Sequence, residues 1–326
     1  MTWTPVFRLP EHMIVVICAL VLLIWATLVF VGDLECVEGS LLDDLSYCLT
    51  YGVATIVERA LPARLHGSCG VPCESSAAGV VMFAVLYAGS GVGVFVQMLD
   101  KVSRAEQALA VGYLLAVLAS FMAACRSDPG IVTPANAMQM IQLFPADGIL
   151  RTEKACETCL LMRPAQAKHH GGHCVAYFDH YCVWMRNVIG LFNMRYFLLF
   201  LLVTSTACAH GAFVGARLLY REIFFVRGWR PSCRVLLRIL ANRYQVLTAL
   251  MAFLIVASVA LFAFFAMHLV QVLRGVTSYE CIKLRRLDKK TRAAYLGRGM
   301  SLDVLRIILR PRMCLLRAGM DVNKTD

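Results

Sequence analysis

The chain has 326 residues, of which 59% are apolar and 16% are charged, and its mean hydropathy is +0.67. Because a soluble domain is about half apolar and about one quarter charged, this composition excludes an ordinary soluble globular protein. The net charge is +11, and thirteen of the 32 basic residues follow Leu273, which favours contact with an anionic membrane surface over binding to nucleic acid.

Apolar stretches long enough to cross about 30 Å of hydrocarbon recur along the chain. The first, at residues 13–31, is a span or a signal anchor, because it is longer than the apolar region of a cleaved signal peptide. Four further stretches follow, at residues 77–99, 109–125, 196–214 and 246–273. The predicted fold class is an all-α polytopic membrane protein, with a four-helix transmembrane core and one or two extra N-terminal helices.

Residues 41–61 leave the number of spans open. Apolar side chains recur there at helical spacing, but charged side chains, from Asp43 to Arg59, occupy the opposite face. We interpret this segment as an amphipathic helix on the membrane surface, and a sixth span is the alternative. Five spans would place the N-terminus in the lumen, whereas six would place it in the cytosol.

The spans divide the chain into five segments. Residues 1–76 hold the first span and the amphipathic segment, 77–125 two spans, 126–195 a polar insert, 196–273 two more spans, and 274–326 a basic tail. Two spans separate the insert from the tail, so both lie on the same side of the membrane. The positive charge of the tail predicts that this side is cytosolic.

An arginine-rich loop between the last two spans conflicts with this orientation, because the same parity places it on the opposite side. We reconcile the two by a surface helix whose arginines lie against lipid headgroups, which either leaflet allows. The arginines are Arg217, Arg221, Arg227, Arg230, Arg234, Arg238 and Arg243.

The insert carries the residues expected to do chemistry. Cys156 and Cys159 are spaced as one zinc-binding turn, and His169 and Cys174 can complete four ligands. Such a set favours a structural zinc in a reducing compartment over a disulfide framework. The alternative is four unrelated polar residues whose spacing is chance.

A second cluster, Asp179, His180 and Cys182, predicts a nucleophile. A free thiol has a pKa of about 8.5 and is mostly protonated in the cytosol, so a nearby imidazole is needed to take its proton. Asp179 could orient that imidazole. Residue types alone are weak evidence here, because side chains close in sequence often point apart.

The insert and its flanks resemble the DHHC-type protein S-acyltransferases, integral membrane enzymes that palmitoylate cysteine side chains. The signature tetrad is present as Asp179-His180-Tyr181-Cys182, a DHYC variant. Further motifs follow the family's order over about residues 77–310. They are Asp128-Pro129-Gly130, Arg163-Pro164, the set Trp184, Asn187, Gly190, Asn193 and Phe197, and Thr277-Ser278-Tyr279-Glu280, with a weaker match at Tyr295 and residues 299–303.

The resemblance implies two zinc ions in the family's insert, each bound by three cysteines and a histidine. The four candidate ligands of this chain, Cys156, Cys159, His169 and Cys174, match the first site completely. The second set falls on His170, His173, Tyr181 and Val188, and a valine cannot bind a metal. We therefore expect one zinc, with the loss of the second offset by packing of the aromatic side chains Tyr177, Phe178, Tyr181 and Trp184.

The resemblance also implies a two-step transfer of palmitate from acyl-CoA to protein cysteines. Cys182 would attack the thioester and become acylated, with His180 as the base and Asp179 orienting it. The acyl chain would lie among the spans while CoA stays in water, because each buried CH₂ contributes about 0.8 kcal/mol. The thiol is therefore expected where lipid meets cytoplasm.

Supporting residues follow from the same resemblance. Thr277 or Ser278 would bond to Asp179 and brace it, and the remaining supporting residues are Glu280, Trp184 and Asn187. The implied partners are acyl-CoA, proteins with membrane-proximal cysteines, and membrane lipids, with no nucleic acid. The expected location is an endomembrane, in the Golgi or the ER, with the insert in the cytosol.

Two other functions stay open. The lost second metal site would suit a catalytically weak or inactive membrane scaffold that binds zinc. A transporter would need paired charges or broken helices at mid-depth, and the spans show neither in the sequence.

Several residues outside the insert allow two interpretations each. His210 and His268 lie within spans, where a histidine is either functional or simply packed. Cys125, Cys281 and Cys314 lie near span ends and are sites of autoacylation or ordinary thiols. Residues 301–309 predict a helix on the cytosolic surface.

Overall fold

The computed structural model describes residues 101–182, 184–296 and 302–309. The predicted span at residues 13–31, the amphipathic segment 41–61, the span 77–99 and Cys314 lie outside the described residues. The four-helix core and the total number of spans therefore stay predictions.

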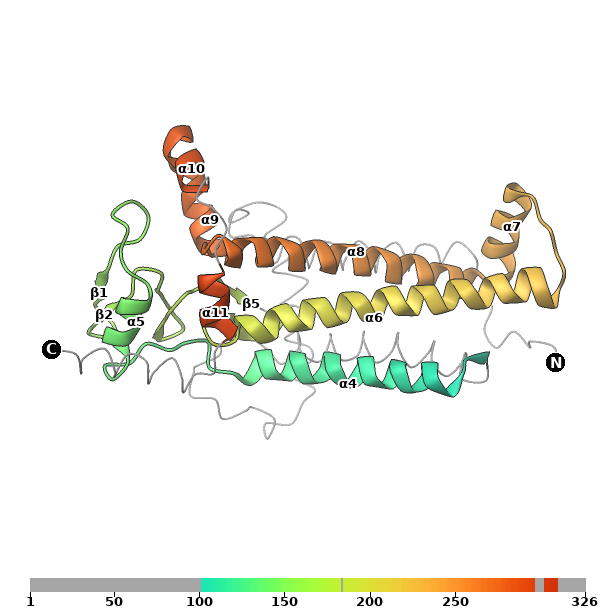
Figure 1. Ribbon diagram of the computed structural model, residues 1–326, viewed down its shortest axis with the longest axis horizontal. Coiled ribbons are helices and arrows are strands. Elements are labelled where there is room, and N and C mark those ends of the chain that lie inside the picture. The colour runs from blue at the N-terminus through green and yellow to red at the C-terminus, as the bar shows by residue number, and fades with distance from the viewer. Residues whose placement is uncertain (1–100, 183, 297–301, 310–326) are drawn as a thin grey trace, which may run out of the picture.

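Three long helices run side by side, and α6 lies between the other two (Figure 1). They are α4 (Arg104–Arg126), α6 (Met194–Tyr220), which a π-helical turn η4 (Arg221–Val226) continues, and α8 (Gln245–Leu273). All three are long and apolar enough to cross a membrane. This confirms that the predicted spans at residues 109–125, 196–214 and 246–273 are helices of the length and composition that a span requires.

Each of these helices is longer than its apolar stretch. α4 starts at Arg104 because the Ser103 hydroxyl accepts a hydrogen bond from the Glu106 N–H at 3.3 Å, while the Glu106 carboxylate accepts one from the Ser103 N–H at 3.0 Å. This reciprocal cap satisfies two N–H groups that a helix start leaves free. Hydropathy alone misses such polar helix ends.

A glycine of α6 packs closely against α8. A Cβ at Gly215 would lie 2.8 Å from Cγ of Met251, so a larger residue there would force the Met251 side chain to shift. Farther along the same contact, the Ser258 hydroxyl donates a hydrogen bond to the Ser205 carbonyl at 2.9 Å. Small residues at such contacts are typical of helices that associate in membranes.

A helix with no buried residue, α7 (Cys233–Arg243), follows in the predicted arginine-rich loop, but it holds only Arg234, Arg238 and Arg243 of the seven arginines. The others lie earlier, Arg217 in α6, Arg221 in η4, and Arg227 and Arg230 in the connection to α7. The guanidinium groups of Arg227 and Arg243 lie 5.1 and 5.7 Å from the ring centre of Trp229, an aromatic residue of the kind found at membrane interfaces. Contact of α7 with lipid headgroups stays a prediction.

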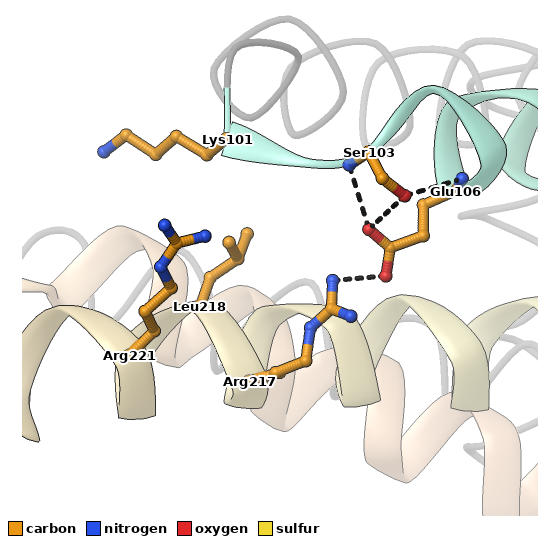
Figure 2. Close-up of a pocket in the computed structure, with 6 residues that line it drawn as sticks. All are labelled: Lys101, Ser103, Glu106, Arg217, Leu218 and Arg221. Atoms are coloured by element: carbon orange, nitrogen blue, oxygen red, sulfur yellow. Dashed lines mark hydrogen bonds and ion pairs between the residues drawn. The ribbon is translucent and has the colours of Figure 1, made fainter. Parts of the chain in front are cut away.

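A cavity of about 400 Å³ lies at the end of the bundle opposite the insert. Figure 2 shows its lining residues, which come from the start of α4 and from the end of α6 and the start of η4: Lys101, Ser103, Glu106, Arg217, Leu218 and Arg221. Glu106 and Arg217 form an ion pair between the two helices. The cavity contains none of the predicted catalytic or metal-binding residues.

The insert between α4 and α6 is built from short elements. One helix and three two-stranded antiparallel hairpins follow in order: α5 (Ala137–Leu143), β1 (Lys154–Cys156) with β2 (Leu161–Arg163), β3 (Lys168–His170) with β4 (His173–Val175), and β5 (His180–Cys182) with β6 (Asn187–Ile189). In the described residues after α8 lie the short helices α9 (Ser278–Arg285), α10 (Lys289–Leu296) and α11 (Asp303–Leu309).

One buried apolar cluster joins the insert to the helix ends. Met185, Ile189 and Leu191 of the insert belong to it, as do Phe121 of α4 and Phe197 of α6. This packing places the β5–β6 hairpin against the bundle.

Two further features tighten the junction between insert and bundle. A Cβ at Gly190 would lie 2.5 Å from the Pro129 carbonyl oxygen, so only glycine fits there. The helix predicted at residues 301–309 is α11, and its Ile308 is buried in the same apolar cluster. This helix therefore packs with its apolar side on the bundle instead of standing free on the surface.

Candidate active site

The four predicted metal ligands come together at the ends of two hairpins. Cys156 and Cys159 lie on the β1–β2 turn, and His169 is directly opposite Cys174 in the β3–β4 pair. Nδ1 of His169 lies 3.4, 3.3 and 3.8 Å from the sulfur atoms of Cys156, Cys159 and Cys174. A tetrahedral zinc with bonds of about 2.0–2.3 Å separates its ligand atoms by about 3.5–3.8 Å, so this group fits the ion.

Within the described residues, this is the single group of three or more side chains suited to hold a metal. Three of the four positions of the family's second site, His170, Tyr181 and Val188, instead lie in an aromatic cluster. The ring of His170 is 5.0 Å from that of Tyr181 and 5.9 Å from that of Phe178, while Val188 and Phe178 are buried together. Side-chain packing thus occupies the position where the resemblance implied a second metal ion. The packing includes Phe178 and Tyr181, two of the aromatic residues named for this role from the sequence. A content of one zinc stays a prediction.

The β5–β6 hairpin brings the predicted base and nucleophile onto one face. Side chains alternate along a strand, so His180 and Cys182 share a face and Tyr181 points the other way. Burial agrees, because His180 and Cys182 are buried, whereas Tyr181 is half-buried against the aromatic cluster that contains Phe178 and Val188. The spacing of two residues, weak evidence by itself, gains its meaning from the strand.

Asp179 is buried and holds His180. Its Oδ2 accepts a hydrogen bond from Nδ1 of His180 at 2.7 Å, and its Oδ1 accepts one from the Ser278 N–H at 2.7 Å. Burial alone would raise the pKa of Asp179, but these bonds and the nearby imidazoles lower it to about 2. The ionised carboxylate can only accept, so His180 carries its proton on Nδ1 and Nε2 is the basic nitrogen.

A second imidazole lies beside Asp179. Nδ1 of His268, in the penultimate turn of α8, is 3.5 Å from Oδ2 of Asp179, and its ring centre is 5.7 Å from that of His180. The sequence left His268 open between function and packing, and nothing along the chain connects residue 268 with residue 179. The only available signal was an ionisable residue near the end of a span.

The start of α9 supplies the brace for Asp179. The side chain of Thr277 caps the helix, accepting a hydrogen bond from the Glu280 N–H at 3.2 Å, and Glu280 accepts one from the Thr277 N–H at 3.1 Å. Ser278 makes the predicted contact with Asp179, but through its backbone N–H, since its hydroxyl donates to Gln271 at 3.0 Å. The helix start, with its free N–H groups, is therefore what binds the carboxylate.

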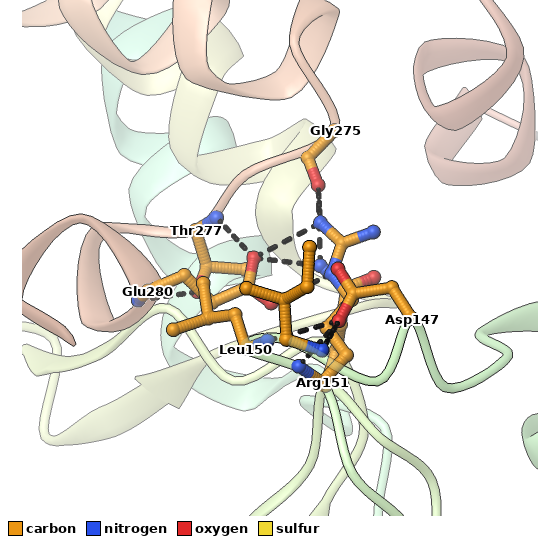
Figure 3. Close-up of polar contacts among 8 residues, drawn as sticks. Asp147, Leu150, Arg151, Gly275, Thr277 and Glu280 are labelled. Atoms are coloured by element: carbon orange, nitrogen blue, oxygen red, sulfur yellow. Dashed lines mark hydrogen bonds and ion pairs between the residues drawn. The ribbon is translucent and has the colours of Figure 1, made fainter. Parts of the chain in front are cut away.

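Glu280 also fastens the insert to the end of α8 (Figure 3). Nε of Arg151 donates to Glu280 at 2.8 Å, and Nε2 of Gln166 donates to the same carboxylate at 2.8 Å. The Gly275 carbonyl accepts bonds from both Arg151 and Gln166. Arg151 and Gln166 were not singled out in the sequence, because their partner lies more than one hundred residues away.

Loss of Arg151 is expected to destabilise this junction. Breaking a buried ion pair commonly costs about 3–5 kcal/mol, so we expect Arg151→Met to lower the free energy of unfolding by on the order of 3 kcal/mol. Denaturant unfolding in detergent would measure the change. The double variant R151M/E280Q should recover part of the loss, because it leaves no carboxylate unpaired.

The exposed pair Arg306 and Asp303, whose side chains are 66% and 76% exposed, is the matched control. Arg306→Met should change the free energy of unfolding by less than about 1 kcal/mol. If Arg151→Met unfolds as the native protein does, the Arg151–Glu280 pair does not hold the insert.

Asn187 fixes the hairpin to the end of α4. It pairs with Cys182 across the β5–β6 register, and its side-chain amide donates to the carbonyls of Ala124, Cys125 and Ser127 at 3.1, 3.2 and 2.8 Å. These carbonyls belong to the helix end, where no intrahelical donor remains. Cys182 is thereby held at the end of an apolar helix.

Two other predicted residues lie close to this site. Trp184 packs on the apolar cluster that contains Cys182. Cys281, in α9, is half-buried, and burial raises the pKa of its thiol to about 11, so it is a poor nucleophile at neutral pH.

The fold and the site together define a membrane protein with a cysteine- and histidine-rich insert that presents an aspartate, a histidine and a cysteine at the helix ends. Residues 149–285 match the sequence model of the DHHC palmitoyltransferase family. This match confirms the family predicted from the sequence for that part of the chain.

Individual relatives agree. "Palmitoyltransferase ZDHHC4" of Bos taurus is 38% identical over 116 residues, which are 34% of this chain and 34% of that protein. "Palmitoyltransferase SWF1" of Yarrowia lipolytica is 33% identical over 184 residues, 53% of this chain and 48% of that protein. The chain thus spans between one third and one half of the length of these relatives.

Proposed function

We propose that the protein is an S-acyltransferase that moves a long-chain acyl group, palmitate, from acyl-CoA to protein cysteines through an acyl-Cys182 intermediate. The observation that carries this proposal is the shared face of His180 and Cys182 on the β5–β6 hairpin, with Asp179 bonded to His180, at the end of three apolar helices. The family match and the names of the relatives support the same activity.

In the first half-reaction, Cys182 gives its thiol proton to Nε2 of His180 as its sulfur attacks the thioester carbonyl carbon. A bond forms between Sγ and that carbon, and the bond from the carbon to the CoA sulfur breaks. The CoA sulfur leaves with the proton that His180 accepted. Asp179 stays ionised and stabilises the imidazolium.

The second half-reaction repeats the same proton path with a protein substrate. A substrate cysteine gives its proton to His180 and attacks the carbonyl of acyl-Cys182. The new thioester forms on the substrate, the bond to Sγ of Cys182 breaks, and Cys182 recovers the proton from His180. No other reactant is needed, because one thioester replaces another.

The position of Cys182 suits a substrate that is part lipid and part water-soluble. An acyl chain of about sixteen carbons gains about 0.8 kcal/mol per buried CH₂ and belongs among the helices, whereas CoA belongs in water. The proposal places the insert in the cytosol of an endomembrane, Golgi or ER, where acyl-CoA reaches it, and takes proteins with membrane-proximal cysteines as substrates.

One zinc is part of this proposal. Bound by Cys156, Cys159, His169 and Cys174, it would supply a structural cross-link, since protein atoms take all four ligand positions. These residues join the β1–β2 turn to the β3–β4 hairpin. Their role is to hold these parts of the insert together.

Labelling with a clickable palmitoyl-CoA analogue tests the activity. The native protein should acquire a label that hydroxylamine removes, as a thioester requires, and Cys182→Ser should acquire none. Cys125→Ser, which changes a thiol packed on the same apolar cluster, is the matched control and should label like the native protein. Equal labelling of Cys182→Ser and native protein would refute the assigned nucleophile.

An inactive zinc-binding scaffold is the second candidate. The observation that favours it is the aromatic cluster at the positions of the family's second metal site. Under this alternative the native protein stays unlabelled in the same assay, although it binds zinc.

A further inference from the structure

His268 is a buried ionisable residue that the proposed reaction does not use. It is 2% exposed and lies in α8, five residues before the helix ends at Leu273. Burying an imidazole beside a membrane helix end is costly unless the ring finds a polar partner. A polar partner is therefore expected near the buried ring of His268.

Among the described residues, the polar groups beside His268 are the carboxylate of Asp179 and the imidazole of His180. Its ring lies edge to face with Phe197 at 5.0 Å and with Phe264 at 4.5 Å, so apolar rings enclose it. Neither ring nitrogen of His268 makes a hydrogen bond to a described residue. Oδ2 of Asp179 lies 3.5 Å from Nδ1, too far for a well-formed hydrogen bond. The imidazole is thus aimed at the carboxylate that holds His180.

We propose that His268 is a positioning residue, which donates from Nδ1 to Asp179 and thereby fixes His180 in the orientation that accepts the thiol proton of Cys182. This inference rests on the proposed function. It adds to the predicted triad a fourth side chain, supplied by a span and not by the insert.

The geometry gives the carboxylate three points of attachment. Oδ1 accepts from the Ser278 N–H and Oδ2 accepts from His180, each at 2.7 Å, and Oδ2 has a further lone pair for His268. Ser278 follows the end of α8, and His268 lies within α8, so both fix Asp179 relative to the same helix. The distance of 3.5 Å is long for a hydrogen bond, and such contacts tighten when a substrate is bound.

Three variants separate this role from simple packing. His268→Leu fills the space without a donor, and we expect the rate of Cys182 acylation to fall by about 10- to 100-fold at saturating acyl-CoA, with KM little changed. His268→Asn keeps an N–H near the position of Nδ1 and should restore the rate to within about threefold. His268→Gln places its N–H near Nε2 instead and should not restore it.

His210 provides the matched control. It is the other histidine in the described membrane helices, and it contacts Tyr113 at 5.4 Å between ring centres. His210→Leu should acylate at the native rate. Equal rates for native protein, His268→Leu and His268→Asn would overturn the inference while leaving the proposed function intact, and so would a loss in His268→Leu that Asn fails to restore.

A second readout does not depend on acyl transfer. Alkylation of Cys182 by iodoacetamide, followed by mass spectrometry, reports how well His180 accepts the thiol proton. His268→Leu should slow this alkylation and His268→Asn should restore it. If native protein never acylates but alkylation follows this order, the proposed function fails and the positioning role stands; alkylation at one rate in all variants overturns the positioning role.

Discussion

Asp179→Asn is expected to lower the rate of Cys182 acylation by about 10⁴-fold, the loss that the same change causes in serine triads. An asparagine can turn its amide N–H towards Nδ1 of His180, which moves the imidazole proton to Nε2. In that tautomer Nε2 has no lone pair for the thiol proton. Asp179 is 2% exposed, so water cannot substitute for the lost carboxylate.

Initial rates of autoacylation with palmitoyl-CoA would measure this loss. The double variant D179N/H180Q should be no slower than the slower single variant, since the two residues act as a unit. Ser278→Ala is the control, because its backbone N–H still reaches Asp179, and it should keep the native rate within about threefold. An Asp179→Asn protein that acylates at the native rate would show that the carboxylate does not set the tautomer.

The grouping of the four candidate metal ligands was predictable because they are close in the sequence. Cys156 and Cys159 share one turn, and His169 and Cys174 face each other across the β3–β4 hairpin, only five residues apart in the sequence. A short connection limits how far apart the residues that it joins can lie, so their spacing in the sequence predicts their proximity in the structure. The same argument covers His180 and Cys182, once the strand that holds them is known.

The residues that brace the site could not be predicted from their spacing in the sequence. His268 and Ser278 meet Asp179 across 89 and 99 residues of chain, and Arg151 meets Glu280 across 129. Their contacts depend on how the insert docks on the ends of α6 and α8. That docking is set by an apolar cluster spread over several elements, and no local pattern encodes it.

The role of Ser278 shows a different limit. A sequence motif indicates which residue meets Asp179 but not which of its atoms does so. The structure places a helix start there, and the backbone N–H, which every residue but proline carries, makes the bond. The hydroxyl is engaged with Gln271.

Removal of the metal is expected to unfold the insert and abolish acylation. The strands of the insert are three residues long, and an isolated two-stranded hairpin is marginal in water, whereas a structural zinc contributes about 10–16 kcal/mol in small zinc-binding peptides. Cys156→Ser should therefore lose zinc and expose residues 149–192 to limited proteolysis, while the long helices stay protected.

Elemental analysis of the purified protein tests the same prediction by measuring the zinc content per chain. We expect close to one zinc per chain in the native protein and close to none in Cys156→Ser. His173→Ala is the matched control, because His173 lies beside Cys174 but belongs to the lost second site, and it should keep both its zinc and its activity. A native content near two would mean that His170 and His173 bind a metal despite the aromatic packing around them, and that the aromatic cluster is not a replacement for the second site.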